Sequence, residues 1–231
     1  MQSLGRDFRA LVIGAHGTIG TALAEQLRAD PNCAHVATIS RATHPYFALE
    51  SETGIEQAAT EIAGEGPFAL IIDATGALTI DGNGPEKHLG ALNAERLARA
   101  FEVNAIGPAL IIKHFSSLLT KDRSIFAKLS ARVGSISDNH KGGWYGYRAA
   151  KAAVNMLLQT AAIELQRRRP DTIVVALQPG TVQSPLSAPF SRGHDTVSPE
   201  ESAVGLLQAM DELQIKSGAQ FVDYKGQPIP W

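Results

Sequence analysis

The sequence predicts an α/β fold: a doubly wound parallel sheet with helices on both faces. Three observations predict it. Short apolar runs of strand length alternate along the chain with longer stretches of helical periodicity. A glycine-rich turn, residues 14–20, joins the first run to the first helical stretch. The 231 residues contain no recognisable linker, so we expect a single domain over residues 1–231.

The strands are predicted from apolar runs bounded by turn residues. They lie at Phe8–Ile13, His35–Ser40, Tyr46–Leu49, Phe68–Asp73, Ser124–Ser130, Thr172–Gln178 and Ala219–Tyr224. Phe68–Asp73 hardly alternates with polar residues, which is typical of a strand covered on both faces. Right-handed crossovers between such strands produce the doubly wound arrangement.

The helices are predicted from apolar residues that recur three and four positions apart. They lie at Thr18–Ala29, near Gly54–Ala63, over Leu92–Leu119 with a break or kink at Pro108, at Tyr145–Arg168 and at Pro199–Leu213. The segment Gln183–Ser198 follows a strand and is rich in Ser, Pro and Gly. Ligands of such sheets bind near the carboxyl ends of strands, so this segment is predicted to be a mobile substrate lid, with an ordinary surface loop as the alternative.

Composition excludes several classes of protein. With 21 Lys and Arg against 23 Asp and Glu, the formal net charge is −2, which gives no overall field to recruit nucleic acid or an anionic membrane. The residues Met1–Arg9 lack the apolar core of a signal peptide, and no apolar run reaches the length of a membrane span. Cys33 stands alone, which excludes an intrachain disulfide and a multi-cysteine metal site. We therefore expect a soluble cytoplasmic protein without a metal site.

The turn between the first strand and the first helix has the features of a dinucleotide site. Its glycines are Gly14, Gly17 and Gly20, and His16, Thr18 and Ile19 stand between them. Glycines permit a tight turn and a close approach of the backbone to a phosphate, and the following helix presents free N–H groups and the positive end of its dipole. The fold is thus predicted to be of the Rossmann type, with this turn under the pyrophosphate.

The residues after the second strand indicate which dinucleotide is preferred. An acidic residue there usually binds the ribose 2′-hydroxyl of NAD, but this chain has Ser40 and Arg41. A guanidinium can bind a 2′-phosphate, so NADP(H) is favoured over NAD(H). His16 is a candidate for a second contact with that phosphate. The alternative is that Arg41 is only a solvated surface charge.

Tyr147 and Lys151 form a candidate catalytic pair. Four residues apart on a predicted helix, they share one face. An ammonium close to a phenol stabilises the phenolate and lowers the pKa of the phenol from about 10. Tyr147 would then serve as an acid–base group nearer neutral pH.

Together these motifs resemble the short-chain dehydrogenase/reductase family, and the resemblance covers nearly the whole chain. Its markers, in order, are the turn at 14–20, Asp73-Ala74-Thr75-Gly76, Asn104 in VNAIGP, Tyr147 with Lys151, and Pro179-Gly180. Within the family the chain is most similar to the C-factor branch, relatives of a bacterial cell–cell signalling protein. The carriers of that similarity are the segments RVGSI (132–136), GGWYGYR (142–148) and the closing IPW (229–231).

The resemblance implies hydride transfer between nicotinamide and a carbonyl carbon. Tyr147 would exchange the proton on the substrate oxygen, Lys151 would lower the pKa of Tyr147 and bind the nicotinamide ribose, and Asn104 would hold a water in a proton relay. The implied cofactor contacts are the glycine turn, Arg41, Asp73, Ala74, Thr75, Gly76, Asn104, Tyr147, Lys151, Pro179, Gly180 and Val182. The family also implies a homodimer or homotetramer formed through the Leu92–Leu119 and Tyr147–Leu165 helices.

Departures from the family pattern raise a second hypothesis. The glycine turn is one residue shorter than usual, and Asp73 replaces a usual asparagine. Ala131 stands where the family has a serine that binds the substrate oxygen, while Ser130 should face the other way along an extended strand. Ser135 and Ser137 are candidates to replace that serine, and losing such a donor commonly costs about 10²–10³ in rate.

Two functions follow from the sequence. The leading hypothesis is an NADP-dependent oxidoreductase that acts on a small carbonyl or alcohol. The alternative is a weak or inactive protein on the same scaffold that acts in signalling or as a dinucleotide sensor.

Overall fold

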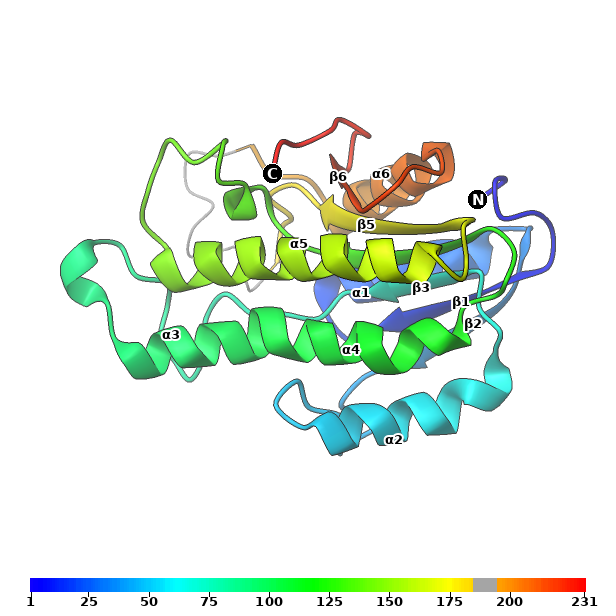
Figure 1. Ribbon diagram of the computed structural model, residues 1–231, viewed down its shortest axis with the longest axis horizontal. Coiled ribbons are helices and arrows are strands. Elements are labelled where there is room, and N and C mark those ends of the chain that lie inside the picture. Colours follow the sequence, from blue (N-terminus) through cyan, green and yellow to red (C-terminus); the bar gives the residue numbers. More distant parts are fainter. Residues whose placement is uncertain (185–194) are drawn as a thin grey trace.

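The computed structural model describes residues 1–184 and 195–231. Its strands are β1 (Phe8–Ile13), β2 (Cys33–Ile39), β3 (Leu70–Asp73), β4 (Ser124–Leu129), β5 (Thr172–Gln178) and β6 (Gln220–Asp223). They form one parallel sheet in the order β2-β1-β3-β4-β5-β6 (Figure 1). The predicted doubly wound, Rossmann-type parallel sheet is confirmed.

Helices cover both faces of this sheet. They are α1 (Thr18–Ala29), α2 (Glu52–Ile62), α3 (Ala94–Phe101), α4 (Gly107–Phe115), α5 (Tyr145–Gln166) and α6 (Pro199–Glu212). Figure 1 shows α4 and α5 side by side in front of the sheet, with α1 behind it. No helix within the described part of the chain is long and apolar enough to cross a membrane.

Alternation along each strand divides the apolar core into two layers. On β1, Leu11 and Ile13 pack with the buried residues of α2, α4 and α5. Ala10 and Val12, between them, pack with the buried residues of α1 and α6. Both layers consist of side chains removed from water, so both faces of the sheet contribute to the hydrophobic stabilisation of the fold.

The predicted strand at Tyr46–Leu49 is wrong. Phe47 N–H donates to the His44 carbonyl and Ser51 N–H donates to the Ala48 carbonyl, so the backbone bends into successive turns. Phe47 is nevertheless buried in the core, because a turn also carries an apolar side chain inward. The other predicted strands are confirmed, with ends that differ by two residues or fewer.

The long helical stretch predicted over Leu92–Leu119 is interrupted before Pro108. Between α3 and α4 the chain forms a π-helical turn, Glu102–Ile106, in which Gly107 N–H donates to the Glu102 carbonyl. Pro108 lies in the first turn of α4, directly after the π turn that replaces regular α-helical pairing there. The turn keeps the two helices nearly continuous and carries Asn104.

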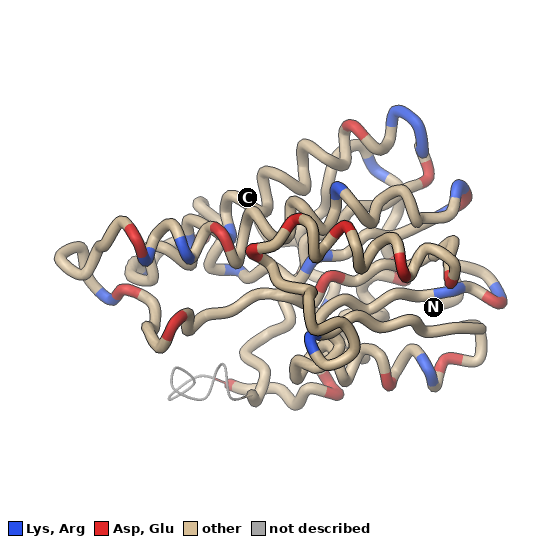
Figure 2. The backbone as a smooth tube through the Cα atoms, turned by 90° about the horizontal axis from the view of Figure 1, so that it is seen from below, with Lys and Arg blue, Asp and Glu red and all other residues tan. Residues whose placement is uncertain are grey.

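Charged residues of both signs are interspersed along the described part of the chain, as Figure 2 shows. Since all strands are parallel, their carboxyl ends meet at one edge of the sheet. Gly14, Arg41, Ala74, Ser130 and Pro179 each follow a strand end there. This edge brings together the residues that the motifs singled out.

Candidate active site

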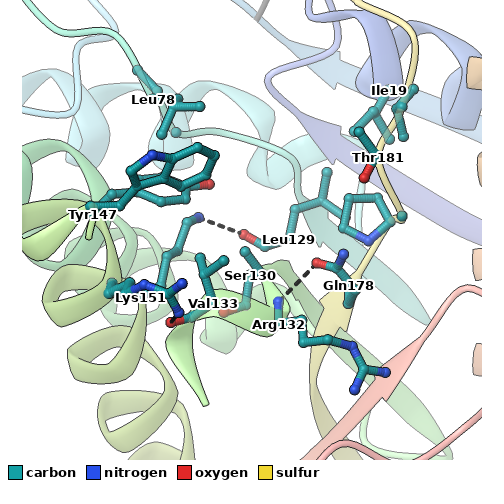
Figure 3. Close-up of a pocket in the computed structure, with 18 of the residues that line it drawn as sticks. Ile19, Leu78, Leu129, Ser130, Arg132, Val133, Tyr147, Lys151, Gln178 and Thr181 are labelled. Carbon is teal, nitrogen blue, oxygen red and sulfur yellow. Dashed lines mark hydrogen bonds between the residues drawn. The ribbon is translucent and has the colours of Figure 1, made fainter. Parts of the chain in front are cut away.

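A cavity of about 730 Å³ opens at the carboxyl edge of the sheet (Figure 3). Loops after β3, β4 and β5 form its walls, together with the first turns of α1 and α5. The residues on its walls include Ile19, Ala74, Thr75, Gly76, Leu78, Ala131, Val133, Trp144, Tyr147, Arg148, Lys151, Pro179, Gly180, Thr181 and Val182. Five separate stretches of the chain that carry the sequence motifs therefore meet at one cavity.

The glycine turn packs so closely against its neighbours that its backbone leaves no space for side chains. Gly14 has φ +84°, and a Cβ there would lie 3.1 Å from the Thr75 nitrogen. A Cβ on Gly20 would lie 2.3 Å from the Gly14 carbonyl oxygen, so α1 packs directly against the turn. Only glycine allows both approaches.

The start of α1 is open to a ligand. Gly17 precedes the helix, and among residues 1–184 and 195–231 no side chain accepts a hydrogen bond from its first amides. These N–H groups have no partner within the helix and form a natural anion site. Ile19 lines the cavity, while His16 and Gly17 are exposed at its side.

Arg41 lies at the edge of the glycine turn. Gly14 N–H donates to the Ile39 carbonyl over 2.8 Å, and this hydrogen bond joins the turn to the end of β2. Ser40 is buried there, and Arg41 beyond it is exposed. The parallel pairing of β1 and β2 thus brings Arg41 to the same edge of the sheet as the glycine turn, although Arg41 does not line the cavity.

Tyr147 and Lys151 share one face of α5, as their spacing predicts. Lys151 Nζ lies 5.6 Å from the centre of the Tyr147 ring and donates to the Leu129 carbonyl over 3.1 Å. Both side chains line the cavity (Figure 3). The Trp144 ring stands edge-on to that of Tyr147. Lys151 is only 3% exposed, so its amine is removed from solvent.

The prediction that Lys151 lowers the pKa of Tyr147 is wrong for the protein alone. Burial raises the pKa of Tyr147 to about 12. Burial and the nearby charge of Lys128 lower the pKa of Lys151 to about 7, against the opposing effect of Asp73. Because Lys151 is only partly charged at neutral pH, desolvation outweighs its attraction for a phenolate.

Asn104 holds the loop that follows β3. Its Oδ1 accepts from Ala77 N–H over 3.1 Å, and its Nδ2 donates to the Ala77 carbonyl over 2.9 Å. A Cβ on Gly76 would lie 3.0 Å from Asn104 Oδ1 and 3.5 Å from Lys151 Nζ. The glycine therefore lets the amide and the amine converge behind the cavity wall.

Asp73 and Lys128 form an ion pair under that loop. Lys128 Nζ lies 2.9 Å from Asp73 Oδ1, and the side chains are 1% and 0% exposed. The same amine donates to the Thr75 carbonyl over 2.7 Å and to Thr75 Oγ1 over 3.1 Å. Asp73 does not line the cavity. In the structure it fixes the loop that carries Ala74, Thr75 and Gly76.

Comparison with known proteins identifies the family of this chain. The family model described as short chain dehydrogenase matches residues 9–195. The chain belongs to that family. It is 32% identical to C-signal of Myxococcus xanthus over 169 residues, which cover 72% of this chain and 94% of C-signal. The resemblance to the C-factor branch is thereby confirmed.

Two further similarities cover almost the whole chain. The 1-hydroxy-2-glutathionyl-2-methyl-3-butene dehydrogenase of Rhodococcus sp. (strain AD45) is 27% identical over 231 residues, 96% of this chain and 98% of the relative. The NADPH-bound carbonyl reductase from chicken fatty liver superposes with a TM-score of 0.84 at 21% identity, covering 98% and 95% of the two chains. The latter shows that the fold is shared.

Ala131 stands at the position that corresponds to the serine of the short-chain dehydrogenase family. Ala131 lines the cavity, as its alignment with the family serine predicts. Ser130 also lies on the wall, but its hydroxyl donates to Asn155 Oδ1 over 2.7 Å. Ser135 Oγ accepts from Asp138 N–H, and Ser137 Oγ donates to the Trp231 carbonyl. In these positions neither Ser135 nor Ser137 lines the cavity.

The loop after β5 completes the site of this short-chain dehydrogenase. Pro179, Gly180 and Val182 line the cavity, and Gly180 has φ +83°. Of the predicted lid at 183–198, residues 185–194 lie outside the described residues. The two ends that are described are joined, because Gln183 N–H donates to the Val197 carbonyl over 2.9 Å.

Sequence reasoning missed several residues of the site. Lys128 could have been singled out from the sequence, since it is the one charged residue in the mostly apolar strand Ser124–Leu129. Trp144 and Arg148 stand out in the sequence only as part of a family motif, yet both line the cavity. Glu86, buried behind Tyr147 in an irregular segment, had no pattern by which to find it.

Proposed function

We propose that this protein is an NADP-dependent oxidoreductase that transfers hydride between nicotinamide and a small carbonyl or alcohol substrate. The observation that carries the proposal is the position of Tyr147 and Lys151. The amine lies 5.6 Å from the phenol ring, and both groups line the cavity that Ile19 of α1 also lines. A proton donor is thus available beside a dinucleotide seated on the glycine turn.

The residues present fit the cofactor, because Gly14 and Gly20 let the turn pack against its neighbours and the first amides of α1 have no side-chain cap. The amides at the start of α1 would bind the pyrophosphate, and Lys151 would bind the nicotinamide ribose. Once bound, the cofactor supplies or accepts the hydride. Pro179, Gly180 and Val182 would flank the nicotinamide from the loop after β5.

Tyr147 supplies the proton in the reducing direction. Its pKa of about 12 keeps the phenol protonated at neutral pH, which is the form that donates. As the carbonyl carbon gains hydride, the carbonyl oxygen takes the Tyr147 proton and an alcohol results. The phenolate left behind lies near Lys151, and the protonated form of that amine would stabilise it.

Arg41 supports a preference for NADP(H) over NAD(H). It is exposed beside the start of α1, where a 2′-phosphate would lie, and no carboxylate replaces it at the end of β2. The chicken relative in the structural comparison was solved with NADPH bound. We propose the same cofactor for this chain.

Substrate class follows from the cavity and from one relative. Apolar side chains such as Leu78, Val133 and Trp144 stand around the Tyr147 ring, which favours a carbonyl or alcohol with an apolar body. The Rhodococcus relative is named for a glutathionyl-bearing alcohol. A substrate panel should therefore include aliphatic and aromatic carbonyls and glutathione conjugates.

A second function is favoured by one observation. Ala131 lines the cavity and offers no hydrogen bond to a substrate oxygen. A protein with this site would bind a dinucleotide but turn over slowly, and it would act in signalling or as a dinucleotide sensor. Its similarity to C-signal is consistent with this alternative.

The distinguishing experiment compares Tyr147→Phe with Tyr145→Phe. If the protein is a reductase, NADPH oxidation with an active carbonyl falls about 10²–10⁴-fold in Tyr147→Phe, while NADPH binding stays intact. Tyr145, on the same helix turn but not on the cavity wall, serves as the matched control. Tight NADPH binding without turnover of any panel member would favour the sensor.

The organisation around the site completes the proposal. We propose one domain over residues 1–231, with 183–198 as a substrate lid, in a cytoplasmic protein. A homodimer or homotetramer would bury the exposed apolar side chains of α5, among them Met156 at 66%, Leu157 at 40% and Ile163 at 43% exposure. Light scattering at the monomer mass would contradict the oligomer.

A further inference from the structure

The start of α5 has an unusual support. Trp144 precedes the helix in the left-handed region, at φ 54° and ψ 42°, and its side chain does not cap the first amides. Helices usually have a Ser, Thr, Asp or Asn at this position, whose oxygen accepts from an amide of the first turn. The helix that carries Tyr147 and Lys151 therefore needs an acceptor from elsewhere.

Glu86 provides that acceptor from a distant segment. Its Oε2 accepts from Gly146 N–H over 2.9 Å, and its backbone carbonyl accepts from Trp144 N–H over 2.5 Å. The side chain is only 7% exposed. A buried carboxylate is expensive unless it is hydrogen-bonded, and the positive end of a helix dipole is a favourable place for it.

The fit between the carboxylate and the helix is close. A Cβ on Gly146 would lie 3.0 Å from Glu86 Oε1 and 3.2 Å from the Ala100 side chain. Gly146 therefore lets the carboxylate and α3 approach the first turn of α5. Tyr147 is the next residue, so any displacement of this turn displaces the phenol.

Glu86 also lines a second cavity, of about 390 Å³, on the far side of Tyr147. Tyr147 lines both cavities, whereas Asn104 and Glu86 line only the second one. A change at Glu86 thus reaches Tyr147 through the helix, without altering the wall on which a dinucleotide would lie.

We propose that Glu86 is a positioning residue for Tyr147: its carboxylate caps α5 in place of an N-cap side chain and holds the phenol in register with the active-site cavity. The catalytic part of this inference rests on the proposed function. The capping part can be measured without any turnover.

Three substitutions at Glu86 distinguish the effect of its side-chain length from the effect of its charge. Glu86→Ala removes the acceptor, Glu86→Asp keeps the charge but shortens the side chain by one methylene, and Glu86→Gln keeps both the length and an acceptor oxygen. Glu95→Ala is the matched control, since Glu95 lines the same second cavity and is exposed, and the structure records no bond from it to α5.

Hydrogen exchange of peptides that cover residues 144–150 tests the cap directly. We expect the Gly146 amide to exchange about tenfold faster in Glu86→Ala and Glu86→Asp, because it has no partner within the helix. Glu86→Gln and Glu95→Ala should match the wild-type protein. Unchanged exchange in both Glu86→Ala and Glu86→Asp would overturn the proposal.

Kinetics test the consequence for Tyr147. With an active carbonyl substrate, kcat should fall about 10- to 100-fold in Glu86→Ala and Glu86→Asp, since a small misplacement of a catalytic group is costly. Glu86→Gln should restore kcat to within about threefold, because its amide oxygen still accepts from Gly146 N–H. The affinity for NADPH should stay within about twofold in every variant, because Glu86 does not line the first cavity.

The outcomes distinguish this inference from the proposed function. Wild-type kcat in Glu86→Asp, or parallel losses of NADPH affinity and kcat, would overturn the positioning role. If Glu86→Ala does not fold, Glu86→Asp and Glu86→Gln decide the question. If the wild-type protein turns over no carbonyl, the proposed function fails, and the exchange of the Gly146 amide alone decides whether Glu86 caps the helix.

Discussion

Lys128 Nζ on β4 lies 2.9 Å from Asp73 Oδ1 on β3, and both side chains are almost completely buried. The amine also binds Thr75, so one lysine joins two strand ends to the loop that forms a wall of the active-site cavity. Removing one member of a buried ion pair leaves an uncompensated charge, which is more costly than the loss of an exposed pair.

The first prediction concerns this pair. Lys128→Met should lower the free energy of unfolding by about 3–5 kcal/mol, whereas Lys113→Met, which removes an exposed pair with Glu52, should hardly change it. Adding Asp73→Asn to Lys128→Met should recover part of the loss, because the orphaned charge disappears. Urea unfolding measures all four proteins. Equal losses in Lys128→Met and Lys113→Met would contradict the prediction.

The second prediction is a pH dependence of stability. Lys151 has a pKa of about 7 in the folded protein, against an ordinary value of 10.5. Between these values the unfolded chain binds more protons than the folded protein, so the free energy of unfolding rises with pH. Below pH 7 both states are protonated, and this contribution no longer changes. The rise should be about 2 kcal/mol between pH 7 and pH 9.

Lys151→Met should remove that rise, as measured by urea unfolding at the two pH values. Burial also lowers the pKa of Lys128, which adds a slope of the same sign in both proteins. Tyr147, whose pKa is raised, lowers stability only above pH 10 and does not enter this window. If the free energy of unfolding of Lys151→Met rises with pH as steeply as that of the wild-type protein, Lys151 is charged in the folded protein.

The third prediction concerns cofactor preference. Arg41→Ala should weaken NADPH binding about 10- to 100-fold and leave NADH binding within about twofold, because a guanidinium bound to the 2′-phosphate is the difference between them. Arg28→Ala, an exposed arginine at the other end of α1, is the control. Titration of cofactor fluorescence measures both affinities. A similar loss for NADH would show that Arg41 acts on something other than the 2′-phosphate.

The fourth prediction concerns the missing serine. Ala131→Ser should raise kcat/KM for carbonyl reduction about 10²-fold, because a hydroxyl at this place on the cavity wall can donate to the substrate oxygen. Ser135→Ala should leave kcat/KM unchanged, since Ser135 does not line the cavity and its hydroxyl accepts from Asp138 N–H. If kcat/KM is unchanged in Ala131→Ser, another group already donates a hydrogen bond to the substrate oxygen.

The sheet and most of the site could be predicted because their signals are local. Alternating strands and helices predict a parallel sheet, and each motif follows a strand end, so the topology alone brings them to one edge. The error at Tyr46–Leu49 has a physical cause, because successive turns bury Phe47 and pack Tyr46 and Leu49 against the core as a strand could.

The supporting residues could not be predicted because their partners are remote in sequence. Lys128 contacts a carboxylate 55 residues earlier, and Glu86 caps a helix 60 residues later. The spacing of Tyr147 and Lys151 likewise predicts a shared face but not the pKa of either group, which depends on burial and on Lys128. Three-dimensional surroundings, rather than residue type, decide these properties.

The π-helical turn Glu102–Ile106 has a consequence for length changes in this stretch. A π turn accommodates one residue more than an α-helical path between the same two ends. Deleting a single residue there would let α3 run into α4 as one regular helix, and every side chain upstream would rotate by about 100° around the axis. Asn104 would then lose both of its hydrogen bonds to the Ala77 backbone. Substitutions in this turn should therefore be tolerated far better than a deletion or an insertion.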